Sequence, residues 1–153
     1  MKYQKSGATT QYAERPSIIN WTKQNLPDAF NFFITDFDMV IRNRDGDLMI
    51  VEVKNQKAVM PKAQRTTYHI IDKLIRQALG GKNVGVIDVM GHRMKVQYHG
   101  FHVLTFEKNG FHDGKAYING KLFSEQHIIE LLSFQKTFKQ IFNEREKMSS
   151  LKV

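Results

Sequence analysis

The chain has 153 residues, of which 41% are hydrophobic and 25% charged, and it contains no cysteine. These values are ordinary for a globular protein and leave room for one hydrophobic core. The lack of cysteine excludes disulfides, thiolate metal sites and a cysteine nucleophile, and it fits the reducing conditions of a cytoplasm. No apolar stretch approaches the roughly 18 residues that span a bilayer, and no apolar run follows the first lysines. We therefore expect neither a membrane segment nor a signal peptide.

The net charge is +8, from 23 Lys and Arg against 15 Asp and Glu. An excess of positive charge favours polyanionic partners, because binding releases counterions and steers association. Many small basic proteins carry such a charge without a specific partner. Charge alone therefore makes nucleic acid the leading candidate without deciding the matter.

We predict a single domain over residues 1–153. Residues 1–15 are polar and are expected to be loosely ordered. Apolar residues at helical spacing follow Pro16, and they predict a short amphipathic helix that ends before Pro27, because the residue before a proline avoids helical geometry.

The next segment predicts a β-hairpin spanning Phe32–Asn55. Its first arm, FNFFITDFDMVIRN, is dense in aromatic and β-branched residues, and its second arm is LMIVEVKN. Between the arms, Arg44-Asp45-Gly46-Asp47 supplies residues that favour a turn.

A helix is predicted over Pro61–Leu79, with Pro61 in its first turn and two glycines after its end. Six residues at helical spacing predict its buried face: Thr67, Ile70, Ile71, Leu74, Ile75 and Ala78.

The rest of the chain predicts three more strands or hairpins and a final helix. The apolar run NVGVIDVM is typical of a buried strand, and Gly100–Phe106 predicts another. Residues 116–123 predict a small hairpin with an Asn119-Gly120 turn. Ser124 then begins a C-terminal helix over residues 124–147. This order predicts an α/β fold, with a central mixed sheet flanked by helices.

Four polar residues stand out in the predicted hairpin. Asp36 and Asp38 lie two residues apart on the first arm, and Glu52 and Lys54 lie two apart on the second. Side chains alternate across a strand, so each pair shares a face. A hairpin that folds about Asp45/Gly46 is expected to bring Asp38 opposite Glu52, and Asp36 opposite Lys54. The four side chains are then expected to converge on one patch.

The simplest alternative is that these residues form an ordinary solvent-exposed face. The residues between them are apolar, which predicts a buried opposite face formed by Phe37, Met39, Ile41, Val51 and Val53. Aspartate is also depleted in strands, and neighbouring carboxylates repel each other unless a cation neutralises them. Oxygen ligands of this kind suit Mg²⁺, with Mn²⁺ as a substitute. A bound metal lowers the pKa of its water, and Lys54 beside it is suited to orient that water.

The run TDFDMVIRNRDGDLMIVEVKN resembles the core of the PD-(D/E)xK nuclease superfamily, which includes restriction enzymes, Holliday-junction resolvases and phage recombination nucleases. The resemblance implies a restriction-endonuclease-like core and a Mg²⁺-dependent endonuclease that hydrolyses DNA phosphodiester bonds. It also suggests a phage or mobile-element origin, and hence a host cytoplasm. Carried over residue by residue, it makes Asp38 and Glu52 the metal ligands and Lys54 the catalytic lysine.

Further roles follow from the same resemblance. Some branches carry a glutamine early in the next helix, where this chain has Gln64, and some add a glutamate before the hairpin, for which Glu14 is the candidate. No proline precedes the aspartate here, so either Asp36 or Asp38 is the main ligand. Lys57, Lys62 and Arg65 follow the site and are expected to contact phosphates of the backbone.

Other assignments remain open at this stage. A non-catalytic nucleic-acid-binding module of the same fold, or an RNA-cleaving nuclease, fits the same residues. A homodimer is compatible with cleavage of both strands, although no pattern specifies one. His99 and His102 are expected on opposite faces of a strand, which argues against a shared zinc ion.

Overall fold

The computed structural model describes Asn25 and residues 37–151. The chain divides between Thr35 and Asp36, and all described residues except Asn25 lie in the second unit. Its elements are β1 (Met39–Arg42), β2 (Asp47–Lys54), α2 (Lys62–Ala78), β3 (Val84–Val89), β4 (His92–Phe106), β5 (Ala116–Ile118), β6 (Lys121–Phe123), α3 (Glu125–Leu132) and α4 (Phe138–Ser150). The helix predicted between Pro16 and Pro27 and the expected loose order of residues 1–15 fall outside the described residues.

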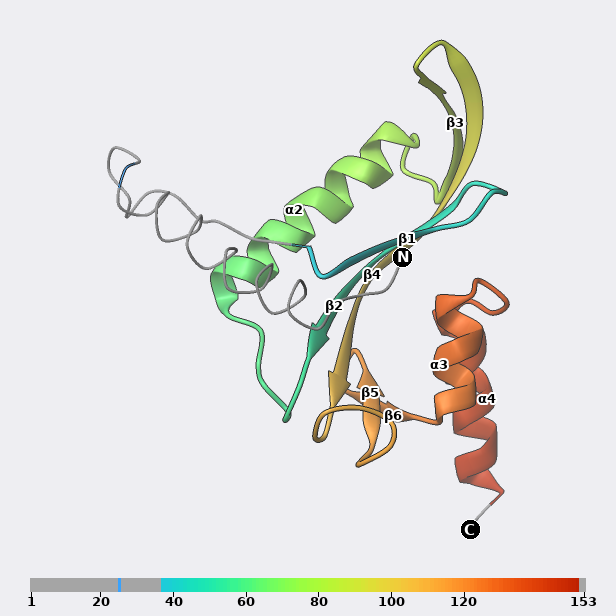
Figure 1. The fold of residues 1–153 in the computed structure, drawn as a ribbon. Coiled ribbons are helices and arrows are strands. Elements are labelled where there is room, and N and C mark those ends of the chain that lie inside the picture. The colour runs from blue at the N-terminus through green and yellow to red at the C-terminus, as the bar shows by residue number, and fades with distance from the viewer. Residues whose placement is uncertain (1–24, 26–36, 152–153) are drawn as a thin grey trace, which may run out of the picture. The chain divides into compact units, whose positions relative to one another are not determined.

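The six strands of the described region form one mixed sheet. Its order is β1-β2-β4-β5-β6, and β3 pairs with β4. Only the β2–β4 pair is parallel among these pairings. Helix α2 lies on one side of the sheet, and α3 and α4 lie on the other (Figure 1). The predicted α/β class with a mixed sheet between helices is therefore confirmed.

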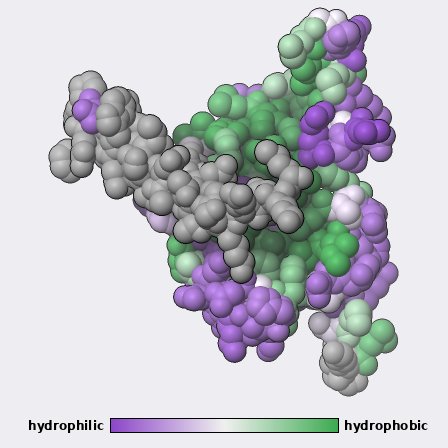
Figure 2. All heavy atoms as spheres, viewed as in Figure 1, coloured by the Kyte–Doolittle hydropathy of each residue, from purple (hydrophilic) through white to green (hydrophobic). Residues whose placement is uncertain are grey.

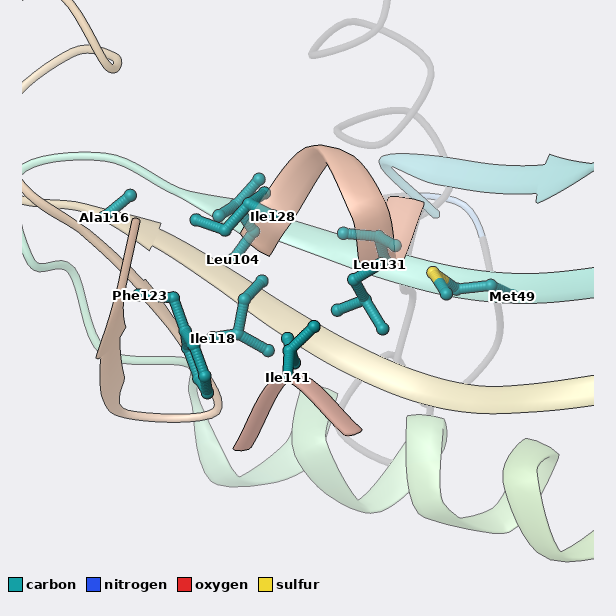
Figure 3. Close-up of a cluster of buried hydrophobic side chains, with 9 residues drawn as sticks. Met49, Leu104, Ala116, Ile118, Phe123, Ile128, Leu131 and Ile141 are labelled. Carbon is teal, nitrogen blue, oxygen red and sulfur yellow. The ribbon is translucent and has the colours of Figure 1, made fainter. Parts of the chain in front are cut away.

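Each face of the sheet has its own hydrophobic core. Under α3 and α4 the buried residues are Met49, Val51, Leu104, Ala116, Ile118, Phe123, Ile128, Leu131 and Ile141 (Figure 3). Under α2 they are Ile50, Met60, Tyr68, Leu79 and Tyr98. Alternate residues of β2 thus enter opposite cores, as the pleat of a strand requires. This alternation sends Glu52 and Lys54 to the α2 side of the sheet.

The β1–β2 hairpin has the predicted register. Met39 pairs with Val51, which puts Asp38, one residue before β1, opposite Glu52. In the turn, the side-chain oxygen of Asn43 accepts hydrogen bonds from the backbone N–H groups of Asp45 and Asp47. Gly46 has φ 91°, and an added Cβ there would lie 2.0 Å from the backbone oxygen of Lys95. Both the conformation and the close approach therefore require glycine.

The strand predicted from NVGVIDVM is observed as β3, but it is not buried. Strand β3 instead forms a hairpin with the first half of β4, through a turn at Met90 and Gly91, which both have positive φ. Val84 and Val86 are exposed on it. The predicted burial was wrong because a short apolar run does not reveal how many of its faces are covered. The first half of β4 was not predicted at all.

Strand β4 carries a bulge that changes the expected placement of two histidines. Leu48 pairs with Tyr98 and Ile50 pairs with Phe101, so β4 holds one residue more than β2 between these pairs. Beyond the bulge the alternation is reset. The rings of His99 and His102 contact Phe134 and Phe138 respectively, which places both on the α3–α4 side. The prediction that they point to opposite faces was wrong.

The C-terminal region forms two helices where one was predicted over residues 124–147. Ser124 caps the first, α3, as predicted, by accepting a hydrogen bond from the His127 N–H. The chain then leaves helical geometry at Phe134, whose φ is 62°. Thr137 starts α4 with a capping box that includes Gln140. The apolar periodicity continues across the break, which hid it from the sequence pattern. The small hairpin before Ser124, with its Asn119-Gly120 turn, is confirmed.

Helix α2 agrees with its prediction in extent but less well in its buried face. Ile71 and Ile75 pack under the helix, whereas Ile70 and Leu74 are 54% and 59% exposed. Hydrophobic residues therefore form much of the surface over its C-terminal half, while the β1–β2 turn is hydrophilic (Figure 2). Within the described residues, every helix is too short or too polar to cross a membrane.

Candidate functional site

The site lies where β2 ends and α2 begins. Glu52 is 2% exposed, and the Lys54 ammonium lies 2.6 Å from its Oε1. The Gln64 amide nitrogen donates a hydrogen bond to the same oxygen at 2.7 Å. The Gln64 amide oxygen in turn accepts one from Lys54 at 3.2 Å. These three residues, selected from the sequence as catalytic, thus form a closed network.

Tyr68 belongs to this network, although the sequence analysis did not select it. Its hydroxyl donates a hydrogen bond to Glu52 Oε2 at 2.5 Å, and its ring stacks on Phe101 with centroids 4.3 Å apart. Burial raises the pKa of Tyr68, and the hydrogen bond to Glu52 raises it further. Tyr68 therefore stays protonated and donates. The available sequence signal was the four-residue spacing from Gln64, which puts both side chains on one helix face.

Asp38 reaches the same patch from across the hairpin. Its Oδ2 accepts a hydrogen bond from the Val53 N–H at 2.8 Å, while the side chain remains exposed to solvent. Partial burial raises the pKa of the Asp38 carboxyl, and repulsion from Glu52 raises it as well. The hydrogen bond from the Val53 N–H and the charge of Lys54 lower the pKa of Asp38, but by less than burial and Glu52 raise it. Two carboxylates thus share one patch at an energetic cost.

The apolar face behind these residues was predicted correctly except at one position. Met39, Ile41, Val51 and Val53 all belong to the core on the α3–α4 side. Phe37 does not: its ring meets the edge of Tyr68 at 5.4 Å between centroids, and it is 42% exposed. Phe37 precedes β1, so strand alternation does not govern its direction.

The oxygens of Asp38 and Glu52 retain capacity to bind a cation. A carboxylate has about four lone pairs. Lys54 and Gln64 use Oε1 of Glu52, and Tyr68 uses one lone pair of Oε2. In Asp38 the Val53 N–H engages Oδ2 alone. A side-chain hydrogen bond between Asp38 and Glu52 also helps raise the pKa of Asp38. Once that proton is lost, the two carboxylates form a donor pair that suits Mg²⁺ when waters and substrate complete the shell.

A third protein ligand is not supplied by the described part of the chain. Among residues 37–151, no three His, Asp or Glu side chains converge as a metal-binding group. Asp36, the third predicted ligand, and Glu14, the alternative from the resemblance, both lie outside the described residues.

The three basic residues predicted to contact nucleic acid surround the start of α2. Lys57 lies in the loop after β2, Lys62 is the first residue of α2, and Arg65 follows one turn later; all three are exposed. The loop bends sharply because Gln56 and Lys57 both have φ 55°. The Lys57 N–H donates to the carbonyl of Phe106 at 3.0 Å, which anchors the loop to the end of β4.

Comparisons with protein-family models, curated proteins and solved structures gave no match to this chain.

Proposed function

We propose that this protein is a Mg²⁺-dependent endonuclease that hydrolyses DNA, built on the restriction-endonuclease-like core of the PD-(D/E)xK superfamily. The observation that carries the proposal is the buried Glu52, held by Lys54, Gln64 and Tyr68 with Asp38 opposite it. Mn²⁺ is expected to substitute for Mg²⁺.

A purely structural ion pair is the competing explanation for Glu52 and Lys54. It accounts for one carboxylate and one ammonium, but not for Asp38, a second carboxyl group that the Val53 N–H holds opposite Glu52. A divalent cation between Asp38 and Glu52 would neutralise the repulsion between the two ionised carboxylates. The arrangement therefore favours a metal-binding site over a structural ion pair.

The chain's own residues have separable roles in this mechanism. Asp38 and Glu52 would hold the metal, which supplies an activated water and neutralises charge on the phosphate. Gln64 and Tyr68 fix the direction of the Glu52 carboxylate. Lys54, about one-fifth exposed, is positioned to hydrogen-bond the attacking water and to stabilise the negative charge that develops on the phosphate oxygens.

Positive charge beside the site supports a polyanionic substrate. Lys57, Lys62 and Arg65 are exposed around the N-terminal turn of α2. That turn has neither an acidic residue nor a side-chain cap, so its partial positive charge adds to theirs. These groups are suited to hold the backbone of a strand whose scissile phosphate lies over Asp38 and Glu52.

The proposal is tested by incubating supercoiled plasmid with the full chain, with and without Mg²⁺. We expect metal-dependent nicking or linearisation by the wild type and at least a hundredfold slower cleavage by Asp38→Ala and Lys54→Met, as loss of a metal ligand or of charge stabilisation produces. Asp45→Ala, on the exposed turn of the same hairpin, is the matched control and should cleave normally.

DNA binding measured in parallel separates the alternatives. Retained binding by the inactive variants supports catalysis by these residues. Binding without cleavage by the wild type would instead identify a non-catalytic module. Preferential cleavage of RNA over DNA of the same sequence would replace the DNA substrate by RNA.

A further inference from the structure

A pocket of about 600 Å³ opens beside the candidate site. It lies between the loop after β2, the first half of α2 and the turn between β5 and β6. The residues that matter for its chemistry are Lys57, Met60, Arg65, His69, Phe101 and Val103. Its volume falls within the roughly 300–1,000 Å³ typical of ligand pockets.

The pocket continues the candidate site across one strand. In the parallel β2–β4 pair, Val103 is the partner of Glu52 and Thr105 is the partner of Lys54. Val103 and Thr105 line the pocket, and Val103 packs in the core on the α2 side. Neighbouring strands lie about 4.8 Å apart. A molecule resting on Val103 is therefore one strand away from Glu52 and two strands away from Asp38.

The lining combines an apolar floor with two cationic side chains. Met60 and Val103 are hydrophobic, and Phe101 presents an aromatic ring that His69 meets edge-on at 6.4 Å. Lys57 and Arg65 line the pocket and are exposed, and no described carboxylate forms an ion pair with either of them. The Lys57 ammonium lies over the Tyr117 ring, 5.9 Å from its centre. An aromatic floor with exposed cations beside it suits a nucleobase joined to a phosphate.

We propose that this pocket receives one unpaired nucleotide of the substrate strand next to the scissile phosphate. Its base would lie against Phe101 and Val103, and its phosphate would contact Lys57 and Arg65. A base inside a duplex is covered by its stacked neighbours and its partner, so only an unpaired or extruded base enters such a pocket. The inference rests on the proposed nuclease function and adds a substrate class: single-stranded DNA, or DNA with unpaired bases at the cleavage position.

The same contacts link the pocket to the carboxylates. Phe101 lines the pocket and also stacks on Tyr68, whose hydroxyl holds Glu52. A base resting on Phe101 would therefore support the side chain that orients a metal ligand.

The test measures binding of fluorescein-labelled oligothymidylate and of a labelled duplex to the full chain by anisotropy, in EDTA at fixed salt. Because EDTA removes divalent metal, the DNA is not cleaved while binding is measured. Ala58→Trp fills the pocket from its exposed loop, and Lys57→Ala and Arg65→Ala remove its two cationic side chains. Lys139→Ala makes the same charge change on α4, across the sheet, and is the matched control.

We expect the wild type to bind the single strand more tightly than the duplex. Ala58→Trp should weaken single-strand binding roughly tenfold, which is the loss expected for one stacked base. Lys57→Ala and Arg65→Ala should each weaken it about tenfold through the loss of one hydrogen bond to a charged phosphate. Lys139→Ala should change it less than about twofold, the effect of one peripheral charge. One abasic site scanned along the oligonucleotide should produce a similar loss in the wild type and none in Ala58→Trp. Thermal unfolding establishes that each variant is folded.

Equal affinity for single strand and duplex would overturn the inference, as would pocket variants that behave like Lys139→Ala. Tighter binding of oligouridylate than of oligothymidylate would overturn the DNA substrate. Pocket-dependent binding by a wild type that fails to cleave any DNA with Mg²⁺ would overturn the nuclease proposal while retaining the nucleotide pocket.

Discussion

The Tyr68 hydroxyl donates a hydrogen bond to Oε2 of Glu52 at 2.5 Å. Gln64, one helical turn before Tyr68 in α2, donates to Oε1 of the same carboxylate. The two oxygens of a nearly inaccessible carboxylate are thus fixed by two side chains from one face of α2. Such a carboxylate cannot rotate freely, and its remaining lone pair has a defined direction.

Tyr68→Phe is expected to weaken metal binding while leaving the fold intact. The ring still stacks on Phe101, but Glu52 loses the donor that orients it. Losing such a supporting hydrogen bond typically costs about 10–100-fold in metal affinity or activity. The Mg²⁺ concentration that gives half-maximal cleavage should therefore rise at least about tenfold. Tyr98→Phe is the matched control, because that hydroxyl donates to Asp72, outside the site. Equal metal dependence in both variants would contradict the role given to Tyr68.

Removing Lys54 alone should destabilise the protein, because it leaves Glu52 buried without its cation. Breaking a buried ion pair from one side typically costs about 3–5 kcal/mol, and the partial exposure of Lys54 favours the lower end. Lys54→Met combined with Glu52→Gln should recover much of this stability, since no buried charge remains. Urea unfolding without metal measures both effects. The double variant should nevertheless stay inactive. Recovery of cleavage together with stability would show that the pair is structural.

The local pattern of the sequence was sufficient for the hairpin site. The observed register is centred on Asp45: Met39 pairs with Val51, which puts Asp38 opposite Glu52, as predicted. The position of Gln64 near Lys54 came from resemblance and is also observed. Tyr68 was missed because a tyrosine on an apolar helix face is usually a packing residue, and its hydroxyl partner comes from a distant strand.

The other differences between the predicted and the observed structure share one physical cause, which is pairing between segments that are distant in the sequence. The bulge near His99 and Gly100 appears only when β4 is aligned with β2. The exposure of Val86 depends on β3 leaving the main sheet with β4. The break after α3 occurs at Phe134, a residue with no intrinsic preference for positive φ. Local periodicity contains none of this information.

Metal binding is expected to depend on pH through Asp38. The pKa of this carboxyl is raised by partial burial and by Glu52, so the folded protein holds the proton more tightly than the unfolded chain. Without metal, this residue's contribution to stability is therefore complete below the ordinary aspartate pKa and is lost as pH rises through the raised value. Mg²⁺ needs the ionised form, so its affinity should rise with pH across the same interval.

Asp38→Asn tests this sign directly. The amide oxygen can still accept the Val53 N–H, but the repulsion from Glu52 disappears. At neutral pH the variant should melt higher than the wild type in EDTA, and Mg²⁺ should no longer raise its melting temperature. Scanning calorimetry at several pH values, with and without Mg²⁺, gives both quantities. A variant that is less stable in EDTA, or that still gains stability from Mg²⁺, would contradict the shared metal site.

Gly46→Ala should disturb the hairpin that aligns Asp38 with Glu52. Both Gly46 and Gly81 have positive φ. A Cβ added at Gly46 would lie 2.0 Å from the Lys95 backbone oxygen, whereas a Cβ added at Gly81 would point into open space. Gly81→Ala should therefore show the conformational cost alone, about 1–2 kcal/mol. Gly46→Ala should exceed it by roughly 2 kcal/mol or more, because a backbone atom of β4 must move. Cleavage should also decline in Gly46→Ala under conditions where it remains folded, since the turn determines which residue stands opposite Glu52. Equal unfolding free energies for the two variants would show that the turn tolerates a side chain.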